Sequence, residues 1–184
     1  MSASFPEVRQ TSFPPLVAPD TRLLILGSLP GASSLAARQY YAHRRNHFWR
    51  LIGAVLDEDL AAPPYARRLA ALARHRVGLW DAVASASRKG SLDAAIRGAV
   101  PNPLADIVTR LPDLQAVACN GQTATRIATR ELANTGLPVI PLPSSSPAHA
   151  AMTMAQKRQH WLELRRFLHA ASCLAPRPTP LEQV

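Results

Sequence analysis

The sequence predicts an α/β fold, a three-layer sandwich in which helices flank a central, mostly parallel sheet of four strands. Four short apolar runs alternate with stretches of helical periodicity, which is the pattern of strand–helix–strand units. With 184 residues, 47% of them hydrophobic, the chain is long enough to bury one core. We therefore expect a single domain over residues 21–174, preceded by an extended segment, residues 1–20, and followed by a disordered tail, residues 175–184.

Each strand is expected where an apolar run ends at a turn residue or a polar residue. The run "TRLLILG" predicts a buried strand that ends at Gly27 and leads into the tight loop "SLPG". The run "RVGLWD" predicts a second strand that ends at Asp81. The third and fourth strands are expected in "LQAVACN" and "LPVIPLP", and the last is followed by the loop "SSSPAHA".

Helical patterns fill the segments between the strands. Residues 45–56 are predicted to form a helix, because their apolar side chains recur at the spacing of one buried face. Residues 63–74, which two prolines open, are the next expected helix. We expect short helices in "SLDAAIRG" and "NPLADIVTRL", a helix over residues 121–132 and a long helix over residues 153–172.

Charge, hydropathy and cysteine content indicate which partners and sites to expect. Lys and Arg number 21 against 12 Asp and Glu, which gives a net charge of +9 and a pI of about 10.9. This charge favours a polyanionic partner such as nucleic acid, although a solvated basic surface is the simpler explanation. Because the sequence has no apolar run of membrane-spanning length and no secretion signal, we expect a cytoplasmic protein and no membrane partner. The isolated Cys119 and Cys173 form no CxxC pair, so no metal site is expected.

Polar residues follow every predicted strand. Open α/β sheets bind ligands at the carboxyl ends of their strands, so these clusters are expected to lie around one crevice. The stretch "QYYAHRRNHFW", residues 39–49, comes shortly after the first loop, and its aromatic and cationic side chains can reach the same place.

These motifs carry a family resemblance. "GSLPG" resembles the first signature of the uracil-DNA glycosylase superfamily, and "LPVIPLPSSSPAHA" resembles its second. "YYAHRRNHFWRLI", "GLWDAVASASRKGSLD" and "CNGQTA" extend the likeness over residues 22–166, and it is greatest to the DNA-deoxyinosine (hypoxanthine-DNA) glycosylase branch. The resemblance implies a glycosylase-like sandwich.

The same resemblance implies an enzyme of base excision repair. Such an enzyme flips a deaminated base, here hypoxanthine, out of DNA and hydrolyses its bond to deoxyribose. No cofactor and no metal are implied, the chain is expected to act as a monomer, and we expect no strand cleavage. Three alternatives remain: uracil, xanthine or a mismatched base as the substrate, a damaged-DNA binding module without catalysis, and, more remotely, a serine hydrolase that uses Ser146 and His149 without a GxSxG elbow.

One departure from the superfamily pattern concerns catalysis. Leu29 stands where most members carry an Asp or Asn that positions the attacking water, and a leucine forms no hydrogen bond. In the hypoxanthine branch an asparagine further along the chain is implicated, and Asn46 matches that position. A cap of the following helix is the alternative role of Asn46, and the two roles are compatible.

The resemblance also implies which residues bind the flipped base. Tyr41 matches the aromatic residue that stacks on the flipped base, with ordinary core packing as the alternative, which suits Phe48 and Trp49 better. Asp81 matches the position of a base-reading Asn in uracil-specific relatives, and a carboxylate there can accept the N1–H of hypoxanthine; a turn cap is the alternative. The remaining base-binding candidates are Gly27, Ser28, Leu29, Gln39 and Tyr40.

The expected DNA-binding residues surround this site. Small residues and backbone N–H groups after the fourth strand can approach phosphates closely, unless the triple serine is an ordinary surface loop. For the residue that fills the gap left by the flipped base, the sequence offers Ala148, His149 and Met152 in that loop. The candidates are Pro30, Gly31, His43, Asn120, Gly121, Ser144, Ser145, Ser146, Pro147, Ala148 and His149, with helix capping as the alternative for Asn120 and Gly121.

Overall fold

The computed structural model describes residues 9–168, and it confirms the predicted α/β fold with a four-stranded parallel sheet. Strand order across this sheet is β3-β2-β6-β7. The four predicted strands are confirmed, and their bounds are β2 Leu23–Gly27, β3 Val77–Asp81, β6 Ala116–Asn120 and β7 Val139–Leu142.

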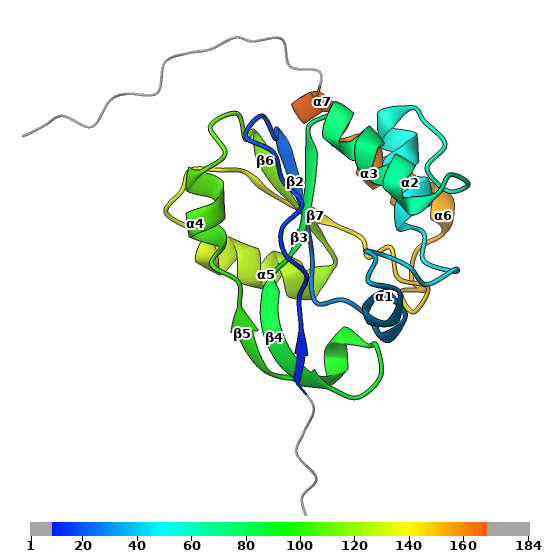
Figure 1. The fold of residues 1–184 in the computed structure, drawn as a ribbon, viewed down its shortest axis with the longest axis vertical. Helices are drawn as coiled ribbons and strands as arrows, with labels where there is room; N and C mark the ends of the chain where they lie inside the picture. The colour runs from blue at the N-terminus through cyan, green and yellow to red at the C-terminus, as the bar shows by residue number, and fades with distance from the viewer. Residues whose placement is uncertain (1–8, 169–184) are drawn as a thin grey trace, which may run out of the picture.

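The register places the ends of these strands together. Gly27 pairs with Asp81 across β2 and β3, and Asn120 pairs with Leu142 across β6 and β7. Since all these pairs are parallel, the polar residues that follow each strand lie at one edge of the sheet. This is the carboxyl edge, at the lower end of the sheet in Figure 1.

Helices cover both faces of the sheet, which gives the expected three layers (Figure 1). One face is covered by α2 (Phe48–Leu56), α3 (Tyr65–Arg74) and α6 (Met154–Leu162), and the other by α4 (Leu104–Thr109) and α5 (Gln122–Glu131).

The central strand shows why both faces need covering. Leu23 and Ile25 of β2 pack into the first hydrophobic cluster, whereas Leu24 and Leu26 pack into the second. All four side chains are fully buried, as expected for a parallel strand whose residues point alternately to the two faces.

A second sheet was not predicted. It is antiparallel, with the order β1-β4-β5, and consists of β1 (Arg9–Thr11), β4 (Val83–Arg88) and β5 (Ile96–Pro101). β4 reads "VASASR", and alanine and serine give little strand signal by themselves. The predicted helix in "SLDAAIRG" is therefore wrong, because only a 3-10 turn, Asp93–Ala95, precedes β5.

Several helix bounds also differ from the prediction. α2 begins at Phe48, three residues later than expected, and α1 (Ala32–Ala37) was not predicted. The long helix expected over residues 153–172 is interrupted, because α6 ends at Leu162 and a separate turn of helix, α7 (Arg165–Leu168), follows. The rest of that helix, the predicted tail and residues 1–8 lie outside the described residues. Between residues 9 and 168, no helix has the length and apolar character needed to cross a membrane.

Candidate active site

A buried carboxylate lies at the carboxyl edge of the sheet. Asp81, the last residue of β3, is 3% exposed, and its Oδ2 atom has no hydrogen-bond partner within residues 9–168. Burial raises the pKa of Asp81 to about 7 and the nearby Asp93 adds to the rise, whereas the Tyr40 hydroxyl and Arg88 act in the opposite direction. A buried acceptor without a partner is costly for stability, which makes Asp81 a candidate ligand-binding group.

Because Gly27 has no side chain, the Asp81 carboxylate and the Tyr41 hydroxyl can both lie next to it. A Cβ atom at Gly27 would lie 2.7 Å from Asp81 Oδ1 and 3.1 Å from the hydroxyl oxygen of Tyr41. Any side chain there would therefore collide with Asp81 and crowd the Tyr41 hydroxyl. The sequence expectation that Gly27, Tyr41 and Asp81 lie together is met by this geometry.

Tyr41 is held by stacking on a core residue. Its ring lies on the Phe48 ring with the centroids 3.7 Å apart and the planes 10° from parallel, so only the opposite face of the Tyr41 ring can receive a base. Its backbone is left-handed, with φ of 55°, which is costly for tyrosine. Burial, and then the charge of Asp81, raise the pKa of Tyr41, so its hydroxyl is a proton donor at neutral pH. Phe48 and Trp49 are core residues, 0% and 4% exposed, as predicted.

Tyr40 is a buried residue of the first hydrophobic cluster and lies near Asp81. Its ring is 4% exposed and packs edge-on against Phe13, with the centroids 5.2 Å apart. Its hydroxyl donates to Pro14 O over 3.5 Å, and the same hydroxyl lowers the pKa of Asp81. Gln39, the other residue expected to close the site, is half-buried.

Asn46 lies where the aromatic stretch meets the loop after β7. Its side-chain oxygen accepts a hydrogen bond of 2.9 Å from the backbone N–H of Phe48, at the start of α2. Asn46 therefore satisfies the first backbone N–H of α2, although the N-cap residue itself is His47. The backbone N–H of the next residue, His47, donates to Ser145 O over 3.0 Å, which joins the two segments. Since a carboxamide has a second oxygen lone pair and two N–H donors, capping leaves Asn46 capable of a further contact.

The loop after β7, residues 144–149, is called the serine loop below, and it is anchored from underneath. Asn120 Nδ2 donates to Ser145 Oγ, and Ser145 N donates to Asn120 Oδ1, both over 2.8 Å. The two residues are 7% and 0% exposed, so they hold the loop and do not face solvent. Gly121 is also buried, and a Cβ atom there would lie 3.3 Å from Ser144 Cβ.

Asn120→Ala should destabilise the protein by about 2–3 kcal/mol, because it removes two buried hydrogen bonds and leaves Ser145 N–H without its acceptor. Urea denaturation of this variant beside wild type measures the change. Gln122→Ala, at an exposed position two residues further on, is the matched control and should be nearly neutral. A loss below about 0.5 kcal/mol for Asn120→Ala would show that the pair does not anchor the loop.

A buried lysine that sequence reasoning missed supports the same loop. Lys157 is 1% exposed, and its ammonium group donates to His149 O over 2.8 Å and to Ser146 O over 3.4 Å. Its burial was not expected, because a lysine on a helix of mixed polarity looks like a solvated residue. One signal could have found it. Lys157 is the fourth residue of a capped helix, "TMAQK", which follows a loop of small residues.

The other site residues predicted from the sequence differ in how deeply they are buried. Leu29 is 6% exposed and packs in the second hydrophobic cluster, so its side chain is a core group. Pro30 is buried beside it. The candidates that reach the surface, being half-buried or exposed, are Ser28, Gly31, His43, Ser144, Ser146, Pro147, Ala148 and His149.

The first loop, residues 28–31, is held by an arginine that was also missed. Arg88, at the end of β4, is 7% exposed and donates to the carbonyl oxygens of Leu29 and Pro30. Its other donors bind Gln10 Oε1 of β1. An arginine in a run of small residues, "ASASRKG", was the available signal. The second sheet therefore fixes the carbonyl side of this loop.

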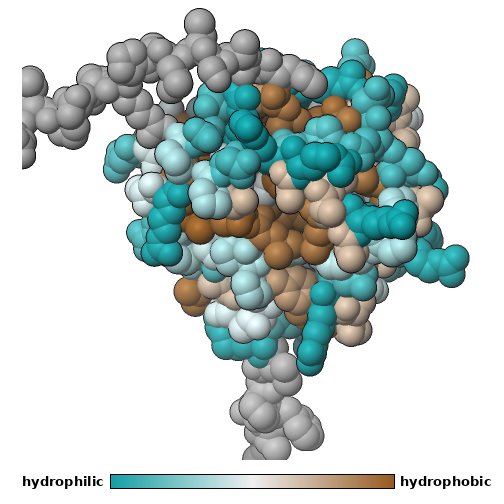
Figure 2. Space-filling model, turned by 45° about the horizontal axis from the view of Figure 1, so that its top comes forward, coloured by the Kyte–Doolittle hydropathy of each residue, from teal (hydrophilic) through white to brown (hydrophobic). Residues whose placement is uncertain are grey.

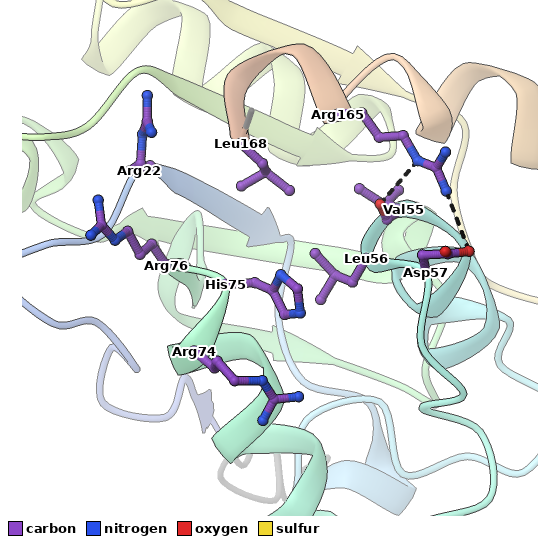
Figure 3. Close-up of a pocket in the computed structure, with 9 residues that line it drawn as sticks. All are labelled: Arg22, Val55, Leu56, Asp57, Arg74, His75, Arg76, Arg165 and Leu168. Atoms are coloured by element: carbon purple, nitrogen blue, oxygen red, sulfur yellow. Dashed lines mark hydrogen bonds and ion pairs between the residues drawn. The ribbon is translucent and has the colours of Figure 1, made fainter. Parts of the chain in front are cut away.

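A hollow at the opposite edge of the sheet is not assigned to this site. It has a volume of about 440 Å³ and is lined by several arginines (Figure 3). Three of the lining residues already have partners: Arg74 and His75 contact Glu58, and Arg165 donates to the backbone of α2. A second hollow of about 240 Å³ is mainly apolar, and Figure 2 shows apolar surface gathered amid hydrophilic residues at this end of the molecule. Within the described residues, no group of three or more His, Cys, Asp or Glu side chains is arranged to hold a metal.

Comparison with known proteins shows the family of this chain. The family model of the uracil DNA glycosylase superfamily matches residues 14–168. The chain therefore belongs to the uracil DNA glycosylase superfamily. It is similar to a solution NMR structure of a protein from Methanosarcina acetivorans that is named as a candidate uracil DNA glycosylase. The TM-score is 0.79 at 32% identity, covering 89% of this chain and 100% of the other.

Two curated relatives are named more narrowly. The hypoxanthine DNA glycosylase of Methanosarcina barkeri is 40% identical over 115 residues, which are 62% of this chain and 73% of that protein. The hypoxanthine DNA glycosylase of Methanosarcina acetivorans is 36% identical over 137 residues, which are 74% of this chain and 86% of that protein.

Proposed function

We propose that this protein is a DNA glycosylase that flips hypoxanthine out of DNA and hydrolyses its bond to deoxyribose, as the first step of base excision repair. The names of the two curated relatives support the activity and the base. The observation that carries the proposal is the buried Asp81 carboxylate, whose Oδ2 atom lacks a partner within the described residues. A flipped base with an N–H edge would supply the missing hydrogen bond.

Asp81 is the residue that selects the base in this proposal. Hypoxanthine carries a hydrogen at N1, whereas adenine has an acceptor lone pair there. An ionised carboxylate only accepts hydrogen bonds, so it favours hypoxanthine and repels adenine. The face of the Tyr41 ring opposite Phe48 stacks on the flipped base, which contributes about 1–3 kcal/mol, and Gly27 leaves room for the Asp81 and Tyr41 side chains.

Asn46 is the catalytic residue in this proposal. The C1′–N9 bond breaks with its electron pair going to the base, water forms the new bond to C1′, and the proton lost by water ends on the released hypoxanthine. The transition state resembles an oxocarbenium ion, so stabilising the departing base contributes more than activating the water. The Asn46 carboxamide, fixed at the start of α2 and beside the serine loop, can hydrogen-bond either the water or the base.

The serine loop binds the DNA backbone in this proposal. Ser144 Oγ accepts from Ser146 N over 3.2 Å, and Ser146 Oγ accepts from Ala148 N over 3.2 Å. Both hydroxyl groups keep their own protons in these bonds, so they can donate to phosphate oxygens. The exposed Arg44 and Arg45 lie on the segment joined to this loop, in keeping with the net charge of +9.

A panel of oligonucleotides tests the function. Duplexes with one hypoxanthine, uracil, xanthine or mismatched thymine are incubated with excess protein and treated with alkali to cleave abasic sites. We expect the hypoxanthine strand to be cut fastest. Equal cutting of the uracil strand would contradict the assignment of the base, and tight binding without cutting of any strand would indicate a damaged-DNA binding module.

The panel also tests the chemistry of the nucleophile. If water attacks, strands remain intact until alkali is added, and borohydride traps no protein on DNA. The exposed Lys89 lies in the connection between β4 and β5, near the first loop, and is the amine to exclude. Strand breaks that need no alkali and disappear in Lys89→Met would contradict a purely hydrolytic enzyme. All proposed site residues come from one chain, so we expect activity from a monomer.

A further inference from the structure

An exposed leucine lies beside the first loop. Leu92, in the connection between β4 and β5, is 58% exposed, the highest value among the exposed large apolar side chains of residues 9–168. The neighbouring Lys89 is exposed as well, as is Arg97 at the start of β5. An apolar side chain among cations on a loop is a suitable arrangement for contact with a base stack between phosphate backbones.

Three hydrogen bonds hold Leu92 in place. Ser91 Oγ accepts from Ala32 N over 3.1 Å, and Asp93 Oδ1 accepts from Ser28 Oγ over 2.6 Å. Leu92 O accepts from Ala95 N over 3.1 Å, in the 3-10 turn that follows. Both chain neighbours of Leu92 are therefore bound to the segment that begins at Gly27 of the proposed site. Its side chain is exposed while its backbone is fixed, which distinguishes it from a residue on a loose loop.

The side chains in and after the serine loop are less suited than Leu92 to contact a base stack. Ala148 is exposed but too small to fill the space of a base, and Met152 is half-buried. His149 is half-buried, and its carbonyl oxygen is bound by Lys157.

We infer that Leu92 is the wedge that enters the base stack and fills the gap left by the flipped hypoxanthine. The inference rests on the proposed function. The serine loop holds the backbone of the target strand on one side of the site, and Leu92 enters the duplex from the side of the first loop. Lys89 and Arg97 contact the flanking phosphates.

The test compares duplex and single-stranded substrates. A wedge matters only where a base stack must be opened, so Leu92→Ala should slow hypoxanthine release from a duplex about tenfold or more. Release from a single strand should stay within about twofold of wild type, because no stacked partner strand has to be separated. Leu92→Met should restore most of the duplex rate. Val100→Ala, at a 50% exposed apolar position on β5, is the control and should change neither rate.

Binding separates this inference from the proposed function. Wild type should bind a duplex with an abasic analogue more tightly than an intact duplex, and Leu92→Ala should lose about tenfold of that preference. This preference can be measured even if wild type releases no hypoxanthine, an outcome that would overturn the proposed function alone. Equal losses by Leu92→Ala on duplex and single strand, or an unchanged preference for the abasic duplex, would overturn the wedge.

Discussion

Asn46→Ala is expected to lower the single-turnover rate of hypoxanthine release by about two to three orders of magnitude, the usual loss when one positioned polar group is removed from a transition state. The same change removes the acceptor for Phe48 N at the start of α2, which costs about 1 kcal/mol of stability. Activity should therefore fall far more than the unfolding midpoint, when rate and urea denaturation are measured on the same preparation.

Asn46→Asp separates the two ways in which this side chain can act. Aspartate keeps an acceptor for Phe48 N and adds a negative charge near a helix start, so stability should be retained. It removes both N–H donors. If Asn46 donates to the departing base, Asn46→Asp is as slow as Asn46→Ala; if it orients water as an acceptor, Asn46→Asp keeps much of the rate. A wild-type rate in Asn46→Ala itself would contradict any catalytic role.

Asp81→Asn is expected to weaken activity and to strengthen the fold. Burial raises the pKa of Asp81 from the ordinary 3.8 to about 7, so the folded protein holds a proton that the unfolded chain loses first. Stability therefore falls as pH rises from about 4 to about 7 and stays low above that. An amide carries no such penalty, so Asp81→Asn should raise the free energy of unfolding at pH 8 by on the order of 2 to 4 kcal/mol and change little at pH 4.

The same pKa sets the pH dependence of activity. Only the ionised carboxylate accepts the N1–H of hypoxanthine strongly, so kcat/KM of wild type should rise about tenfold from pH 6 to pH 8. Asp81→Asn has no charge to gain, and its profile should be flat. At pH 8 it should be slower than wild type by about tenfold to a hundredfold, because a charged hydrogen bond is replaced by a neutral one. Activity that falls with pH in wild type would mean that the protonated acid is the working form.

The parallel sheet and its reactive edge could be predicted from sequence because their signals are local. An apolar run that ends at Gly27 or Asp81 gives both the strand and the place where it stops, and parallel topology then brings these ends together. The burial of Phe48 and Trp49 followed from helical spacing in the same way.

The second sheet and the supporting residues depend on contacts between distant segments. β4 has almost no strand signal of its own, and it is stabilised by pairing with β1 and β5. Arg88 and Lys157 appear in the sequence as ordinary basic residues, and only the fold shows that their charges are buried against the carbonyl groups of two loops. Asn120 and Ser145 were expected at the DNA surface for a similar reason, because a polar residue after a strand gives no indication of its depth.

The contact between Asp81 and N1 of the flipped base is the central claim, and a double-mutant cycle tests it most directly. Single-turnover release is measured at pH 8 for hypoxanthine and for N1-methylhypoxanthine, with wild type and with Asp81→Asn. We predict that the methyl group slows wild type by at least about tenfold, because it removes the N1–H that Asp81 accepts. It should slow Asp81→Asn much less, because that variant has already lost the same hydrogen bond. Equal slowing of the two proteins by the methyl group would contradict the contact.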